Sequence, residues 1–166
     1  MTEAIDKIPA ETRWAIATQG LTGATIAYAK ALKDGIGEDK YNAFINAVWF
    51  EAGKGAKEFA DNLGMAFDNA GELEAVAELF ANTAMGPECQ FEIVEATADR
   101  CVGKATKCPW CERGKEMGLD FDLCSSGHQG WGEGVIEALN PSFKFSLTKN
   151  MVRGDAHCEW VIERKP

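Results

Sequence analysis

The chain has 166 residues, of which 46% are hydrophobic, and a formal net charge of −9. This length favours a single domain whose core needs no covalent staples. The acidic balance argues against a nucleic-acid partner, because phosphates require basic surface. The N-terminal residues lack the apolar segment of a signal peptide, and no apolar run is long enough to cross a bilayer, so we expect a cytoplasmic protein with no membrane contact.

The cysteines are unevenly distributed along the chain. All six lie between Cys89 and Cys158. In a cytoplasmic protein such clustering indicates metal binding or reactivity rather than structural disulfides. We therefore describe residues 1–166 as one domain with a helical half, residues 1–87, and a cysteine-rich α+β half, residues 88–166.

The first half has the periodicity of helices. Apolar residues recur at helical spacing over residues 14–32, until the sequence DGIGED interrupts the pattern. Two further helices are predicted, with apolar faces over residues 41–49 and 73–80. The stripe of the first predicted helix consists of Trp14, Ala17, Leu21, Ala24, Tyr28 and Leu32.

The second half alternates between strand and helix patterns. A strand is predicted near residues 89–93, and residues 143–149 and 158–164 alternate as an antiparallel hairpin would. Between them, a short helix is predicted from Pro109 and a longer one over residues 125–139. The predicted fold class is α+β, with N-terminal helices packed on a small antiparallel sheet that helices interrupt in sequence.

The stretch CPWCERGKEMGLDFDLCSSGH, residues 108–128, carries three cysteines and one of the two histidines. Its first four residues, Cys108-Pro109-Trp110-Cys111, are similar to a redox dithiol. Such sites follow an apolar strand, whereas CVGKATK precedes this one. We therefore disfavour a thioredoxin-type site.

The spacing of Cys108, Cys111, Cys124 and His128 also matches a zinc finger. The loop between the ligand pairs is too acidic for a finger that reads DNA. The same four side chains still provide the thiolates and the imidazole of a tetrahedral zinc site. A structural zinc site therefore stays open as an interpretation.

Cys124 and His128 are a candidate pair in their own right. They are four residues apart at the start of a predicted helix and so share a face. A helix N-terminus lowers the pKa of a cysteine and favours the thiolate, which ligates metals and attacks electrophiles. Cys108 precedes another predicted helix, so we expect its pKa to be lowered and its thiolate favoured in the same way. For Cys89 and Cys101 we expect a role in the core.

Three pieces of the second half resemble the L-2-amino-thiazoline-4-carboxylate hydrolase-like family. They are CPWCERGKEMGLDFDLC, GHQGWGEGVIEALNPSFKFSLTKNM and RGDAHCEWVIER. More distantly, the ending Gly154-Asp155-x-x-Cys158 is similar to that of 4-vinyl reductase domains. The family's cysteine pattern falls on Cys108, Cys124 and Cys158, and Cys111 and His128 are additions to this trio.

The resemblance implies helices packed on an antiparallel sheet, with a ligand cavity between them. It also implies that the last strand brings Cys158 to the helix that carries Cys124. The expected site consists of Cys108, Cys124 and Cys158, completed by His128 or Cys111 as the fourth ligand of a Zn²⁺ ion.

The resemblance implies two functions for this metal-binding protein. A hydrolase would open a C–N bond of a small cyclic amidine or amide, using Cys124 as nucleophile and His128 as acid and base, or a zinc-bound water. A ligand-sensing domain of the 4-vinyl reductase type would bind a small molecule without turnover, with structural zinc.

An iron–sulfur cluster on Cys101, Cys108, Cys111 and Cys124 is the alternative cofactor. Related folds suggest a homodimer, and a subunit that docks another protein through its helical half is a third hypothesis.

Overall fold

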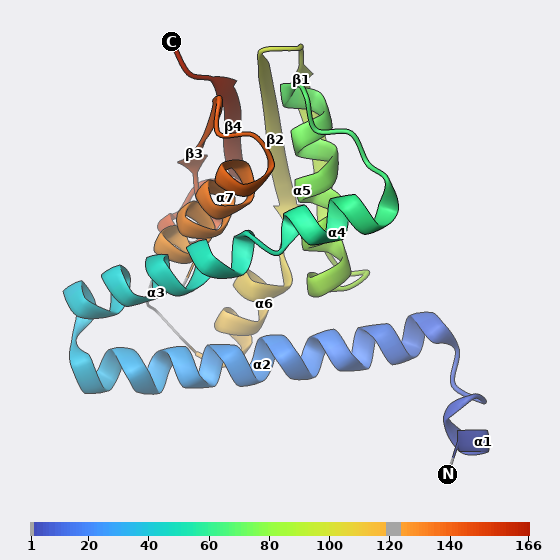
Figure 1. Cartoon of the computed structure of the whole chain (residues 1–166). Helices are drawn as coiled ribbons and strands as arrows, with labels where there is room; N and C mark the ends of the chain where they lie inside the picture. The colour runs from blue at the N-terminus through green and yellow to red at the C-terminus, as the bar shows by residue number, and fades with distance from the viewer. Residues whose placement is uncertain (1, 119–123) are drawn as a thin grey trace.

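The computed structural model describes residues 2–118 and 124–166. Its first half is helical and comprises α1 (Thr2–Ile5), α2 (Ala10–Ile36), α3 (Glu38–Gly53), α4 (Ala56–Leu63) and α5 (Ala70–Met85). Figure 1 shows α2 as a long helix that crosses beneath the rest of the molecule, with α3 running back above it. Gly37 separates the two helices with a φ of 81°, a conformation that favours glycine, which explains the break at DGIGED.

The second half contains the sheet and two further helices. Its elements are β1 (Gln90–Ala96), β2 (Arg100–Lys107), α6 (Pro109–Glu116), α7 (Ser125–Leu139), β3 (Phe143–Lys149), the 3₁₀ helix η1 (Met151–Arg153) and β4 (Cys158–Arg164). The strands form an antiparallel sheet in the order β1-β2-β4-β3. The predicted α+β class and the predicted β3–β4 hairpin are confirmed.

The sequence analysis identified one strand where the structure has the β1–β2 hairpin. A turn over residues 97–99 separates the two strands. The Thr97 N–H donates to the Arg100 carbonyl at 2.8 Å, and the Arg100 N–H donates to the Thr97 hydroxyl at 2.9 Å. This side-chain bond to the backbone closes a turn that contains neither glycine nor proline, so the usual turn signals were missing.

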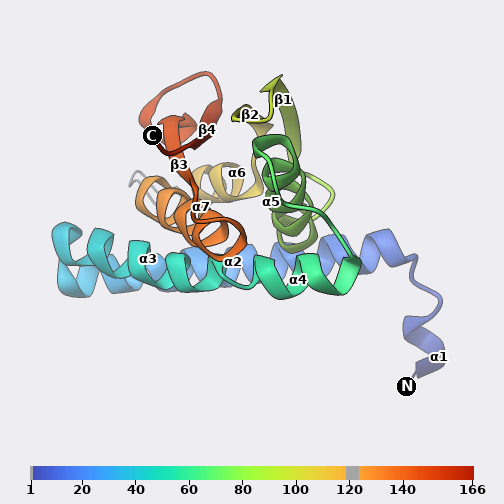
Figure 2. The same cartoon turned by 45° about the horizontal axis from the view of Figure 1, so that its top comes forward.

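The elements form layers, which Figure 2 shows edge-on. Helices α5 and α7 pack on the sheet, and α2, α3 and α4 lie beyond them. The core between the sheet and the helices includes Leu73, Val76, Ile136, Phe143 and Ile162. Among the described residues, no helix combines the length and the apolar character needed to cross a membrane.

The buried face of α2 differs from the predicted stripe. Leu21 and Tyr28 of the stripe are exposed, and the buried residues are instead Thr18, Thr22, Ile26 and Ala29. Each threonine hydroxyl donates to the carbonyl one turn earlier at 2.9 Å. These small polar side chains can therefore be buried without an unmet hydrogen bond, which hydrophobic periodicity does not detect.

Helices α3 and α7 approach closely because α7 lacks side chains where they meet. A Cβ atom on Gly134 would collide with the backbone of Phe50 on α3. One on Gly130 would collide with the backbone of Asn46, also on α3. On its other side, α7 presents Gly132 to the ring of Phe145 on β3, again with no room for a Cβ atom. Glycines on two sides of α7 thus set its distance from both α3 and the sheet.

We expect Gly134→Ala to destabilise the fold. The added methyl group meets backbone atoms that cannot rotate away, and overpacking of this kind costs about 1–3 kcal/mol. The matched control is Gly23→Ala inside α2, where nothing lies within 4 Å of the added atom. That change should stabilise the protein by about 0.5–1 kcal/mol, because alanine favours the helix. Urea unfolding of both variants measures the difference, and shifts of the same sign would contradict this account of α7.

Candidate functional site

A cavity of about 260 Å³ lies between the helices and the sheet. Its wall is mainly apolar and aromatic, with rings from Trp49, Phe91, Trp110, Trp131, Phe145 and Trp160. An engineered cavity of roughly 150 Å³ holds benzene, and pockets for drug-sized molecules start at roughly 300 Å³. The volume therefore suits a compact ligand of about one substituted ring.

All the site residues predicted from the sequence reach this cavity. Cys108 and Cys124 immediately precede α6 and α7, Cys111 and His128 lie on those helices, and Cys158 begins β4. Each of the five contributes to the cavity wall. Cys124, before α7, and Cys158, on the last strand, therefore line the same cavity.

Cys108 has a thiol of lowered pKa in the cavity wall. The neighbouring Cys89 thiol lowers its pKa from 9.0 to about 7, and the backbone N–H groups of Cys111 and Trp110 act in the same direction. Burial opposes this effect but does not cancel it. The pKa of Cys89 is raised in turn, because it keeps its proton beside the Cys108 thiolate. Its own Sγ lies 3.5 Å from the Lys107 carbonyl oxygen. Within this pair, Cys108 therefore loses its proton more readily than Cys89.

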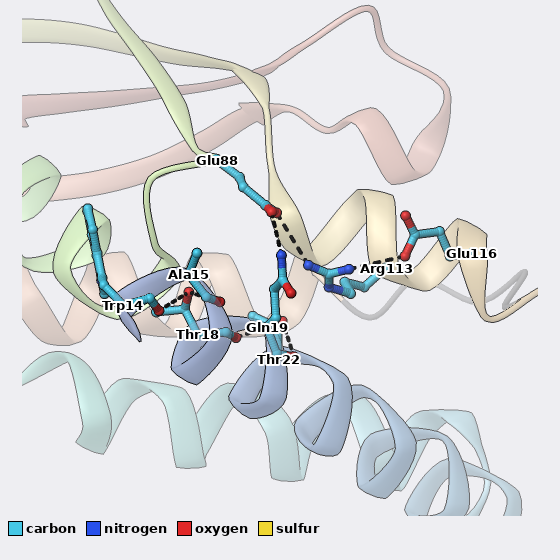
Figure 3. A network of polar contacts seen from close by, with 8 residues as sticks. All are labelled: Trp14, Ala15, Thr18, Gln19, Thr22, Glu88, Arg113 and Glu116. Carbon is cyan, nitrogen blue, oxygen red and sulfur yellow. Dashed lines mark hydrogen bonds and ion pairs between the residues drawn. The ribbon is translucent and has the colours of Figure 1, made fainter. Parts of the chain in front are cut away.

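A network beside Cys89 fixes this pair relative to α6 (Figure 3). Glu88 accepts a hydrogen bond from Gln19 of α2 at 2.8 Å and pairs with Arg113 of α6 at 3.3 Å. Arg113 also pairs with Glu116 at 3.3 Å. Since Glu88 precedes Cys89 directly, α2 and α6 hold the start of this segment in place.

Burial keeps His128 neutral. Its ring centroid lies 5.4 Å from that of Trp160 and 5.7 Å from that of Phe145. This apolar surrounding lowers the pKa of His128 from 6.5 to about 4. The backbone N–H of His128 donates to the Cys124 backbone carbonyl at 2.6 Å, so the two residues lie one helical turn apart. Neutral imidazole can accept a proton or ligate a metal.

Cys158 belongs to a hydrogen-bonded cluster at the start of β4. Its sulfur accepts from the Met151 N–H at 3.4 Å and lies 3.9 Å from the Asn150 side-chain oxygen. The Asn150 amide donates to the Ser125 hydroxyl at 2.7 Å, which ties β4 to the start of α7. Burial raises the pKa of Cys158 to about 11, so this cysteine stays a thiol at neutral pH.

The cavity offers the donor types of a zinc site, four cysteines and one neutral histidine. Within the described ranges, however, no group of three or more histidine, cysteine, aspartate or glutamate side chains is arranged to hold a metal ion. Zinc binding by Cys108, Cys111, Cys124, His128 and Cys158 therefore stays a prediction. So does the iron–sulfur alternative, for which Cys101 is buried in the core rather than in the cavity wall.

Glu74 is a site residue that the sequence analysis missed. It lies on α5, its side chain is 1% exposed, and its Oε2 accepts from the Trp160 indole N–H at 2.8 Å. Burial is the main cause that raises its pKa from 4.5 to about 7, against the Trp160 hydrogen bond, which lowers it. Local sequence gives no signal for this residue, because Trp160 lies 86 positions away.

Two solved structures share the fold. The phenol-responsive sensory domain of the transcription activator PoxR with phenol is 18% identical, with a TM-score of 0.63, over 86% of this chain and 74% of that one. A trafficking protein particle complex subunit 3 from Naegleria fowleri, covalently bound to palmitic acid, is 14% identical. Its TM-score is also 0.63, over 92% of this chain and 97% of that one.

A protein-family model also matches the chain. It describes L-2-amino-thiazoline-4-carboxylic acid hydrolase, and the match covers residues 19–161. The match includes the cavity and every site residue predicted above. No curated protein matches the chain.

Cys108 should be the first cysteine to react with iodoacetamide near neutral pH. Its thiolate fraction, and so its alkylation rate, should rise as the pH passes through about 7. Cys101 and Cys158, with pKa values of about 11, should react far more slowly. Peptide mass spectrometry after short exposures measures each rate.

The variant Cys89→Ala should slow the alkylation of Cys108 at pH 7, because it removes the thiol that favours the thiolate. Cys101→Ala, in the core, is the control. Faster labelling of Cys158 than of Cys108 would disprove this assignment.

Glu74→Gln should change the pH dependence of stability. Folding raises the pKa of Glu74 from 4.5 to about 7, so its contribution is complete below pH 4.5 and is lost as the pH rises through 7. Relative to wild type, the variant should therefore gain up to roughly 3 kcal/mol between pH 4.5 and 8. Urea unfolding at both pH values measures this gain, with the exposed Glu137→Gln as control. A difference from wild type that does not vary with pH would contradict the assignment.

Proposed function

Because this chain belongs to the L-2-amino-thiazoline-4-carboxylic acid hydrolase family, we propose that it hydrolyses a carbon–nitrogen bond of a small molecule bound in the cavity. The observation that carries the proposal is the state of Cys108. This cysteine faces an apolar cavity as a thiol of lowered pKa at the start of a helix. A thiolate at neutral pH is the form that attacks an electrophilic carbon.

The reaction we propose has two steps. The Cys108 thiolate adds to the carbon of the C–N bond, and that bond breaks with its electron pair on nitrogen, which takes up a proton. Water then hydrolyses the thioester or thioimidate and returns the thiolate together with one proton. The proton that nitrogen takes up in the first step equals the one released in the second, so the thiolate is regenerated without a redox partner.

His128 and Cys124 have supporting roles in this proposal. The neutral imidazole of His128 can take the proton from the attacking water, although its low pKa makes it a weak base. Cys124 shares the cavity wall with His128 and was the nucleophile expected from the sequence. We now propose Cys108 for that role, because the causes that lower its pKa are identified in the structure.

The proposed mechanism does not depend on zinc. If Zn²⁺ binds to the thiols of the cavity wall, it would supply Lewis-acid chemistry or a structural link between α6, α7 and β4. The second candidate function is ligand sensing without turnover. The apolar character of the cavity wall favours it, as does the shared fold with a phenol-responsive sensory domain.

Turnover of 2-amino-2-thiazoline by the purified protein tests the hydrolase proposal. Chromatography measures loss of the ring, with the 4-carboxylic acid of the same ring as a second substrate. Cys108→Ser should lower kcat/KM by about 10³-fold or more, because a serine hydroxyl is not ionised at this pH. Cys101→Ser, outside the cavity wall, should stay within about twofold of wild type.

Metal analysis of the same preparations shows whether zinc or iron is present, and an assay after chelation shows whether turnover needs it. Equal activity of Cys108→Ser and wild type would reject Cys108 as the nucleophile. Binding of either compound without any ring opening would favour the sensing function.

A further inference from the structure

Glu74 places a carboxyl group in the wall of an otherwise apolar cavity. The side chain is 1% exposed, and one oxygen accepts the Trp160 hydrogen bond at 2.8 Å. In the part of the chain that the structure describes, no lysine or arginine lines the cavity, and none pairs with Glu74. Ionisation of a buried carboxyl group without a cationic partner is costly. A cation bound in the cavity would offset this cost.

The aromatic rings of the cavity wall also favour positive charge. Trp160, which holds the carboxyl group, packs edge-on against Phe91, with ring centroids 5.8 Å apart. Trp131 and Trp49 contribute further rings to the same wall. The face of an aromatic ring attracts cations, most strongly for tryptophan and in a desolvated site. A carboxylate and several indole rings are the two features that recognise organic cations in proteins.

The charged side chains of the cavity wall do not favour anions. Glu78 lines the wall together with Glu74. The compound named by the family is a carboxylic acid. In the described residues, the wall has no lysine or arginine to pair with its carboxylate, and burial keeps His128 neutral. Transfer of an unpaired carboxylate from water into such a site is strongly unfavourable.

Building on the proposed small-molecule cavity, we infer that its ligand is a compact organic cation without a carboxylate, whose N–H groups, of amidinium or ammonium type, bind Glu74. Glu74 is then the residue that determines specificity. The volume of about 260 Å³ limits the rest of the ligand to about one ring.

Calorimetry with three probes of nearly equal shape tests the inference: benzamidinium, benzamide and benzoate. They differ mainly in charge, which is positive, zero and negative in turn. For the full chain we expect benzamidinium to bind at least about tenfold more tightly than either of the others. Equal or tighter binding of benzoate would overturn the inference, and so would absence of binding by all three probes.

Glu74→Gln separates the charge from the shape of this side chain. The glutamine oxygen can still accept the Trp160 N–H, so the fold should be kept. We expect the affinity for benzamidinium to fall about tenfold and that for benzamide to change by less than about threefold. The exposed Glu137→Gln is the control. Unchanged selectivity in Glu74→Gln would overturn the assignment, and if this variant does not fold, the ratio measured on wild type decides.

These experiments distinguish failure of the cation site from failure of the hydrolase proposal. Selective binding of benzamidinium without turnover of any thiazoline would keep the cation site and reject the hydrolase. Turnover that requires Cys108 but prefers the carboxylic acid would keep the hydrolase and overturn the cation site.

Discussion

The close contact between α3 and α7 is the constraint on which the site depends. Because Gly130 and Gly134 have no side chains, the backbones of the two helices nearly touch. Gly132 allows a similar approach of α7 to Phe145 on the sheet. Helix α7 is therefore held between two layers at distances that no larger residue permits. His128 and Trp131 lie on this helix and reach the cavity because it is fixed so firmly.

The cavity gives identical side chains different chemical states. Cys108 lies beside the thiol of Cys89 and the backbone amides of α6, and its pKa falls to about 7. Cys158 lies in the same wall, but burial dominates there and its pKa rises to about 11. Glu74 loses water without gaining a cation, and its pKa rises toward neutrality. The thiol of lowered pKa, the inert thiol and the carboxyl group are thus distinguished by their surroundings alone.

Sequence patterns predicted those parts of the fold that depend on local regularity. Alternation identified β3 and β4, and glycine and proline marked the ends of α2 and α5. The buried threonines of α2 escaped detection, because their polarity conceals how well their hydroxyls are bonded within the helix. In the site, the cysteine spacing and the family resemblance predicted five residues that line one cavity. Glu74 and the activating role of Cys89 could not be predicted, because each depends on contacts between distant segments.

The position of β4 in the sheet has a consequence for protein synthesis. This strand follows all the other described elements in the chain, yet it lies between β2 and β3. Until this strand has been synthesised and has left the ribosome, β2 and β3 have no common neighbour, and their edges are open to wrong pairing. Trp160 and Cys158 arrive with the same strand, so Glu74 has no indole partner before then. The nascent chain can therefore assemble its helical layers early, whereas the pocket closes only with the last strand.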